Sequence, residues 1–149
     1  MRNTIAFPNC VLTTRDELVL ETWLERHGAD DAFLADIVRE KLDGARVVLT
    51  LDIDPDIATL NSRIAFTLDD AMSDIRILAH CEPNDPLVGL TLPLMTPLGL
   101  SLLGMRTGQT ARMTGQNGSV LRVRLERVVY QPEASAQSRI WKTDPLPCA

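Results

Sequence analysis

The sequence predicts an α+β fold in which a short antiparallel helical hairpin precedes a sheet domain that contains one short helix. Two apolar patterns with helical spacing occupy the first third of the chain, separated by a short polar stretch. Alternating patterns typical of strands follow, and a capped leucine-rich helix interrupts them. We expect three parts: a hairpin over residues 1–52, a sheet domain over 53–134 and a tail over 135–149.

The first predicted helix follows an extended lead-in over residues 1–13. Residues 14–17 read Thr-Arg-Asp-Glu, so Thr14 and Glu17 have the spacing of a capping box. The helix then runs to about Arg26 with apolar positions at Leu20, Trp23 and Leu24, and it ends at Gly28.

The second predicted helix is expected over residues 32–47. Either Asp30 or Asp31 caps its start, and Gly44 weakens the helix without ending it. Two amphipathic helices joined by so short a turn predict an antiparallel coiled-coil hairpin with the two aspartates at its tip. The apolar stripe of this helix has the i, i+3, i+4 spacing and consists of Leu34, Ile37, Val38, Leu42 and Ala45.

A linker over residues 50–56 separates the hairpin from the predicted strands, because Pro55 and three aspartates interrupt any regular element there. One strand should place Ile75, Ile77 and Ala79 on a single face. The strands before the short helix are expected over residues 57–60, 62–67, 74–81 and 90–95.

The most informative segment spans residues 94–108. Thr96 is a good N-cap, Pro97 suits the first helical position, and Gly104 suits a left-handed stop. The leucines between these caps indicate a helix buried in the core, since a helix this short needs tertiary packing. A hairpin with arms over residues 110–114 and 119–130 should follow.

The charge and the apolar content of the chain limit the classes of function that it can have. The net charge of −5 argues against a nucleic-acid-binding surface as the main function, because such surfaces need clustered Lys and Arg. A local cluster of Arg122, Arg124 and Arg127 fits either a solvated sheet face or a contact with an acidic protein surface. We expect a cytoplasmic protein that does not enter the membrane, since no apolar run is long enough to span a bilayer.

Candidate reactive side chains are few. The cysteines, Cys10, Cys81 and Cys148, are odd in number and widely spaced, which fits neither a disulfide framework nor a zinc site. His80 and Cys81 are adjacent on a strand and should point to opposite faces, so they form no dyad. We therefore predict no catalytic residue, no metal and no cofactor.

Three stretches of this chain resemble one family: residues 59–66, 94–108 and 129–134. They are similar to the transcription elongation factors of the Gre type and to their short relatives, the Rnk proteins or regulators of nucleoside diphosphate kinase. The Asn61-Ser62-Arg63 run and the last stretch look like the Rnk branch. The resemblance implies an FKBP-like C-terminal domain after the coiled-coil hairpin.

The resemblance also implies a partner and a docking site. Family members bind RNA polymerase at the mouth of its secondary channel, where the globular domain docks on the rim helices of the β′ subunit. By position, Met95, Thr96 and Pro97 are the implied docking residues, although Gre factors carry Asp or Asn followed by Ser where this chain has Met95 and Thr96. Nucleic acid would be reached only through the polymerase.

Three functions compete at this point. The preferred one is an Rnk-like regulator, not an enzyme, that occupies the rim and competes with Gre factors without cleaving RNA. A transcript-cleavage stimulator would use Asp30 and Asp31 to hold Mg²⁺, but a first helix of about 20 Å is roughly half the length of a Gre finger, as the resemblance implies. A prolyl isomerase is suggested by the implied fold alone, and residues 53–134 offer only Phe66 and Tyr130 for an aromatic pocket.

Overall fold

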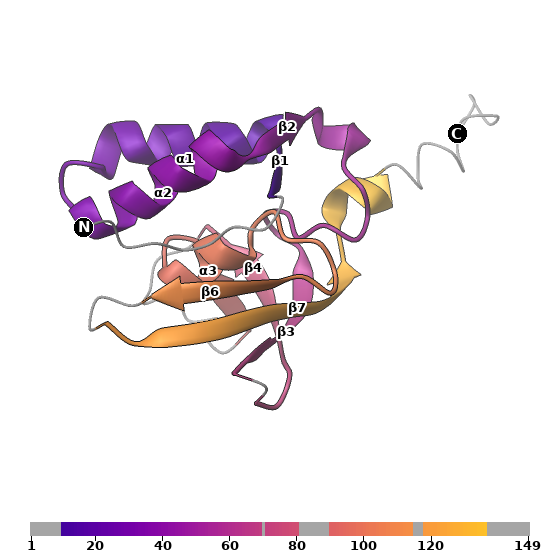
Figure 1. Ribbon diagram of the computed structural model, residues 1–149. Helices are drawn as coiled ribbons and strands as arrows, with labels where there is room; N and C mark the ends of the chain where they lie inside the picture. The colour runs from indigo at the N-terminus through magenta and orange to yellow at the C-terminus, as the bar shows by residue number, and fades with distance from the viewer. Residues whose placement is uncertain (1–9, 70, 81–89, 115–117, 137–149) are drawn as a thin grey trace, which may run out of the picture.

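The computed structural model describes residues 10–69, 71–80, 90–114 and 118–136. The predicted α+β class is confirmed: two helices joined by a short turn precede a mostly antiparallel five-stranded sheet (Figure 1). The elements in chain order are β1 (Val11–Thr13), α1 (Thr14–His27), α2 (Ala32–Gly44), β2 (Arg46–Val48), a 3₁₀ turn η1 (Thr50–Asp52), β3 (Arg63–Leu68), β4 (Asp74–Ala79), β5 (Thr91–Pro93), α3 (Pro97–Leu102), β6 (Thr110–Thr114) and β7 (Val120–Tyr130).

The sheet has the strand order β5-β4-β3-β7-β6. Its pairs are antiparallel except for β4 and β5, which run parallel. The hairpin of α1 and α2 and the short α3 all lie on one side of this sheet, and α2 packs against α3 (Figure 1). The FKBP-like assignment and the coiled-coil geometry of the hairpin remain predictions.

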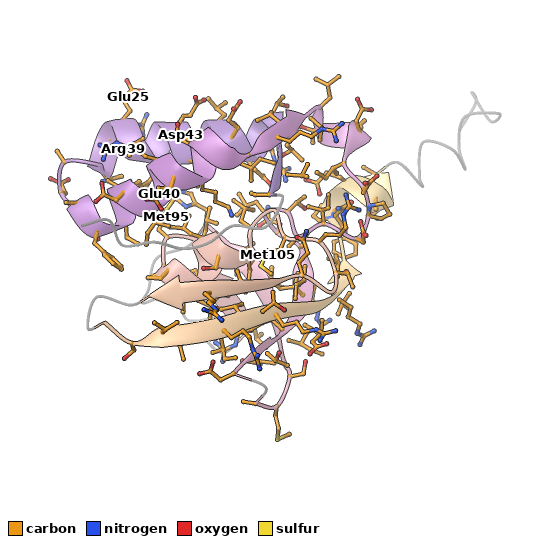
Figure 2. The ribbon with its side chains drawn as sticks, in the orientation of Figure 1. Glu25, Arg39, Glu40, Asp43, Met95 and Met105 are labelled. Carbon is orange, nitrogen blue, oxygen red and sulfur yellow. The ribbon has the colours of Figure 1, made fainter. Side chains whose placement is uncertain are left out.

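A single hydrophobic core joins the hairpin to the sheet. It contains Leu20 of α1 and Ile37 of α2 together with Phe66, Leu100 and Val123. The core therefore runs across the predicted boundary between residues 52 and 53, and the hairpin lies against the sheet domain over part of its surface. On the opposite side of the hairpin, Glu25, Arg39 and Asp43 point away from the sheet (Figure 2).

The N-terminal cap of α1 differs from the prediction, and that of α2 agrees with it. Thr13, not Thr14, caps α1: its hydroxyl accepts a hydrogen bond from the Asp16 N–H at 3.0 Å. Thr13 ends β1 in an extended conformation, which is what an N-cap requires, so the cap lies one residue earlier than the sequence predicted. The Asp31 cap of α2 is confirmed by a hydrogen bond of 3.1 Å from the Leu34 N–H.

The second helix ends at Gly44, so the predicted continuation to Val47 was wrong. Residues Arg46–Val48 instead form β2, which pairs in parallel with β1 in the register Val11↔Arg46, Leu12↔Val47 and Thr13↔Val48. β-branched valines are well suited to a strand. The partner strand, β1, comes before the hairpin in the sequence, and β2 comes directly after it. The two helices are therefore enclosed between paired strands at their base.

One strand prediction was also wrong, and another was right but incomplete. Residues 57–60 form no strand and contribute only an isolated bridge between Ile57 and Arg106, although their side chains are buried as an apolar run predicts. In β4 the predicted face of Ile75 and Ile77 points to solvent, and Leu78 points into the core. Periodicity showed that the two isoleucines share a face but did not show which face is covered.

The capped helix matches its prediction. The Thr96 hydroxyl accepts a hydrogen bond from the Gly99 N–H at 3.0 Å, Pro97 begins α3, and Gly104 has a φ of +85°. β6 and β7 form the predicted hairpin, and β7 ends before Pro132. Cys81 and Cys148 lie outside the described residues, as do residues 115–117 of the β6–β7 turn and the predicted tail beyond residue 136.

A cluster of polar side chains connects the start of α1 to the segment that follows β7. Arg15 donates to the Glu133 carboxylate at 2.8 Å, and Thr59 donates to its other oxygen at 2.7 Å. Asp16 lies beside them and accepts a hydrogen bond of 3.1 Å from the Leu60 N–H. Burial raises the pKa of Asp16 above its ordinary value of 3.8, and the nearby Glu133 adds to the rise, against opposing contributions from Leu60 and Arg15.

This pKa predicts how stability depends on pH. Because the pKa of Asp16 is higher in the folded state, folding takes up a proton, and the free energy of unfolding should fall as pH rises from about 4 through the raised pKa. Asp16→Asn keeps an oxygen that can accept from Leu60 but does not titrate. We expect urea unfolding to give a flatter pH profile for this variant. Identical slopes for the two proteins would contradict the prediction.

Candidate functional site

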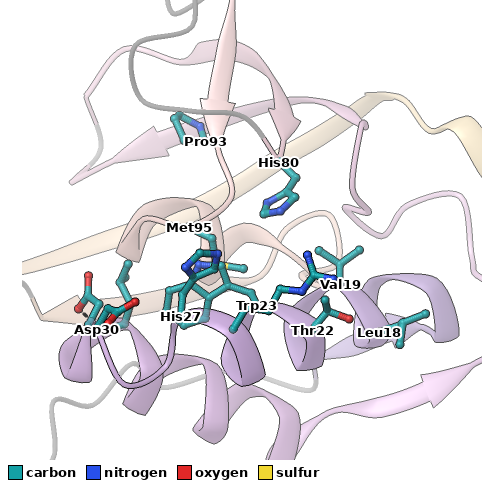
Figure 3. Close-up of a pocket in the computed structure, with 12 residues that line it drawn as sticks. Leu18, Val19, Thr22, Trp23, His27, Asp30, His80, Pro93 and Met95 are labelled. Atoms are coloured by element: carbon teal, nitrogen blue, oxygen red, sulfur yellow. Dashed lines mark hydrogen bonds between the residues drawn. The ribbon is translucent and has the colours of Figure 1, made fainter.

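A groove of about 730 Å³ lies between the helical hairpin and the sheet domain (Figure 3). One wall comes from α1, the turn after it and the start of α2, and the other comes from the residue directly after β4, the end of β5 and the residues that follow β5. The residues that line it are Leu18, Val19, Thr22, Trp23, Arg26, His27, Asp30, Asp31, Leu34, His80, Pro93 and Met95.

The helical repeat explains which side chains of α1 line the groove. Leu18, Thr22 and Arg26 are four residues apart, as are Val19, Trp23 and His27, so two adjacent ridges of α1 face the groove. The rings of Trp23 and His27 lie 6.1 Å apart between centroids, with an interplanar angle of 39°. Leu18 remains 61% exposed, which leaves apolar surface available to a partner.

The sheet wall contains one of the three predicted docking residues. Met95 is half-buried and faces Trp23 and His27 across the groove (Figure 3). Thr96 has a structural role, because its hydroxyl also donates to the Pro93 carbonyl at 2.9 Å while it caps α3. Pro97 occupies the first turn of α3. Neither Thr96 nor Pro97 lines the groove, so Met95 alone presents its side chain there.

The two tip aspartates lie in the same groove. Asp31 accepts the capping hydrogen bond from the Leu34 N–H, and the Asp30 N–H donates to the His27 carbonyl at 3.0 Å. Both residues therefore stabilise the helical turn. Within the described residues, no three His, Cys, Asp or Glu side chains gather in the way that a metal ion requires.

The structure thus brings together residues that the sequence treated as two separate sites. Asp30 and Asp31 at the hairpin tip and Met95 beside α3 are far apart in sequence but line one groove. Sequence reasoning missed the contributions of Leu18, Thr22 and Arg26. An available signal was the distribution of apolar residues 18, 19, 20, 23 and 24 of α1, which cover more than the single face needed for the core.

The groove can bind a partner through mixed contacts. Leucine, valine, tryptophan and methionine side chains provide apolar contact, and Arg26, the histidines and the two aspartates provide polar and charged groups. Protein interfaces commonly combine apolar and polar groups in this way. Phe66 is buried in the core and Tyr130 is exposed on β7, so neither residue supplies an aromatic wall to this groove. Along the described segments, no helix combines the length and the apolar character that a membrane span requires.

Comparison with known proteins points to a single family, although no protein-family model matches the chain. The chain is 27% identical over 130 residues to the regulator of nucleoside diphosphate kinase of Escherichia coli, which covers 86% of this chain and 94% of that protein. The protein of the same name from Shigella flexneri matches equally well.

A solved structure agrees with these relatives. The prokaryotic transcription elongation factor GreA/GreB from Nitrosomonas europaea matches with a TM-score of 0.63 and 28% identity, covering 82% of this chain and all of that one. The sequence relatives carry the Rnk name and the structural match carries the Gre name, as the motifs at residues 59–66, 94–108 and 129–134 predicted. Both comparisons therefore agree that this chain is similar to the Rnk branch of the Gre factor family.

Proposed function

We propose that this protein is a transcription regulator that binds RNA polymerase, docks on the β′ rim helices of the secondary channel, and competes there with Gre factors without cleaving transcripts. The similarity to a GreA/GreB elongation factor supports a polymerase partner. The single observation that carries the docking surface is the position of Met95, which presents a half-buried apolar side chain in a groove next to α3.

The length and position of the hairpin support a regulator that does not cleave RNA. The 14 residues of α1 span about 21 Å at ~1.5 Å per residue. The tip aspartates line the same groove as Met95, so they lie at the proposed docking surface and not far beyond it. A carboxylate that assists cleavage must reach the metal ions of the polymerase, since two-metal catalysis requires ligands within the active site.

A pull-down with core RNA polymerase tests the docking surface. We expect Met95→Glu to weaken binding at least about tenfold, because it places a charge in the apolar part of an interface. Met72→Glu is the matched control, since Met72 is 93% exposed in the turn between β3 and β4 and does not line the groove. Isolated β′ rim helices should compete with the polymerase. Absence of binding at micromolar concentration, or equal binding by both variants, would contradict the proposal.

The alternative function is stimulation of transcript cleavage by the tip carboxylates. A double variant, Asp30→Asn with Asp31→Asn, removes both charges, and asparagine retains the oxygen that caps α2. In a backtracked elongation complex, we expect neither the native protein nor this variant to stimulate cleavage. Stimulation by the native protein that the double variant loses would establish the alternative.

A further inference from the structure

The side of the sheet opposite the helices is strongly basic. Arg63, Arg112, Arg122, Arg124 and Arg127 are all exposed on three adjacent strands, and we call this set the basic sheet face. The register places Arg112 opposite Arg122, and Arg124 beside Thr67 of β3 and Thr110 of β6.

The net charge of this face is positive, whereas the net charge of the whole protein is negative. The chain carries 20 acidic and 15 basic Asp, Glu, Lys and Arg side chains. With five arginines and Glu126 on the basic sheet face, the rest of the chain holds 19 acidic side chains against 10 basic ones. A concentrated positive patch on a negative molecule orients an acidic partner toward one surface and repels it from the others.

The face contains a small hollow with donors suited to a carboxylate. Arg122, Arg124, Thr67 and Thr110 line a cavity of about 320 Å³. The structure already shows a carboxylate beside these groups, because Glu126 lies 3.6 Å from the Arg124 Nε and accepts from the Thr67 hydroxyl at 3.4 Å. Arginine is suited to this contact because its planar fork binds carboxylates through paired hydrogen bonds.

An apolar strip borders the arginines. Ile75 and Ile77 of β4 lie in register with Ala65 and Arg63 of β3, and both isoleucines are exposed. Tyr130 is opposite Arg63 on β7 and is also exposed. We propose that the basic sheet face is a docking surface for a protein segment that carries both carboxylates and apolar side chains, with a carboxylate entering the Arg122–Arg124 hollow.

The same observations disfavour a nucleic acid in this position. Binding of single strands relies on aromatic platforms, and the face offers only Tyr130 among its described side chains. Exposed isoleucines gain from contact with apolar side chains and gain little from a phosphate backbone.

The test uses the full chain and a labelled peptide of about ten residues that alternates glutamate with leucine and spans about 33 Å when extended. Fluorescence anisotropy at about 50 mM salt should show saturable binding that weakens as salt rises. We expect Arg122→Gln with Arg124→Gln to weaken binding at least about tenfold. The matched control is Arg39→Gln with Arg46→Gln, which makes the same charge change on the hairpin side and should alter binding less than about twofold.

Each outcome decides the proposal. Peptide binding lost in the sheet variant and kept in the hairpin control supports it, provided that both variants show the circular dichroism of the native protein. Arg112→Gln, a single exposed change on β6, gives an independent measurement of the same face. No binding at about 1 mM peptide, equal losses in both double variants, or tighter binding of a DNA duplex of about 20 base pairs to this face would overturn it. The peptide assay contains no polymerase. A negative result would therefore not count against the proposal that the groove at Met95 binds RNA polymerase.

Discussion

Gly99→Ala should lower the free energy of unfolding by about 3 kcal/mol, because no space exists for an additional methyl group at this position. A Cβ on Gly99 would overlap the Pro93 carbonyl oxygen and lie 2.7 Å from the Leu94 carbonyl oxygen. Both are backbone atoms, which cannot move aside as the end of a flexible side chain can. The first turn of α3 would have to shift away from β5, and with it the Thr96 cap and the neighbouring Met95.

Chemical denaturation of Gly99→Ala measures this loss, and Gly44→Ala is the matched control. A Cβ on Gly44 meets no atom within 4 Å, and Gly44 is the last residue of α2. Alanine there should change stability by less than about 1 kcal/mol, in the stabilising direction, since it reduces the conformational entropy of the unfolded chain. If the two variants unfold at the same urea concentration, the close contact between α3 and β5 is not a determinant of stability.

Glu133→Ala should cost about 3 kcal/mol, because the Glu133 carboxylate is buried and connects two parts of the fold. It binds Arg15 of α1 at 2.8 Å and Thr59 at 2.7 Å, so its removal leaves the Thr59 hydroxyl without this acceptor. The Arg15 side chain is partly exposed and can be resolvated, which limits its share of the loss. Thermal unfolding followed by circular dichroism measures the change.

Glu133→Gln separates hydrogen bonding from charge. Glutamine can still accept from one donor, so its loss should be smaller than that of alanine. Both variants remove a negative charge that raises the pKa of Asp16, so that pKa should move toward its ordinary value. A titration of the Asp16 carboxyl by NMR reports this shift. An unchanged Asp16 pKa in both variants would show that the two carboxyls do not interact.

The sequence predicted most parts of this fold whose signals are local, although it placed the cap of α1 one residue too late. The cap, proline and glycine around α3 were each identified correctly because Thr96, Pro97 and Gly104 act on their immediate neighbours. The Asp31 cap and the hairpin of β6 and β7 follow the same rule. Helix and turn chemistry depends on a few adjacent residues and can therefore be predicted without tertiary information.

Features that depend on distant partners could not be predicted in this way. β2 forms because β1 lies beside it, although the local pattern favoured a longer α2. Lys41 is fully buried on α2 near the Cys10 thiol, and burial lowers the pKa of its amine, yet nothing in the sequence around it distinguishes it from an exposed lysine. The candidate groove also depends on residues that are distant in sequence, since it forms only where α1 faces Met95.

The paired strands at the base of the helical hairpin determine how its groove can change width. β1 and β2 hold the two chain ends of the hairpin together, and the Val11 N–H binds the Gly104 carbonyl at 3.1 Å, which fixes that base to the end of α3. A rotation of the hairpin that widens or narrows the groove would pivot about this anchor. With an arm of about 20 Å, a rotation of only about 10° displaces the tip by about 3.5 Å, so a small angular change at the base decides whether an extra side chain can enter beside Met95.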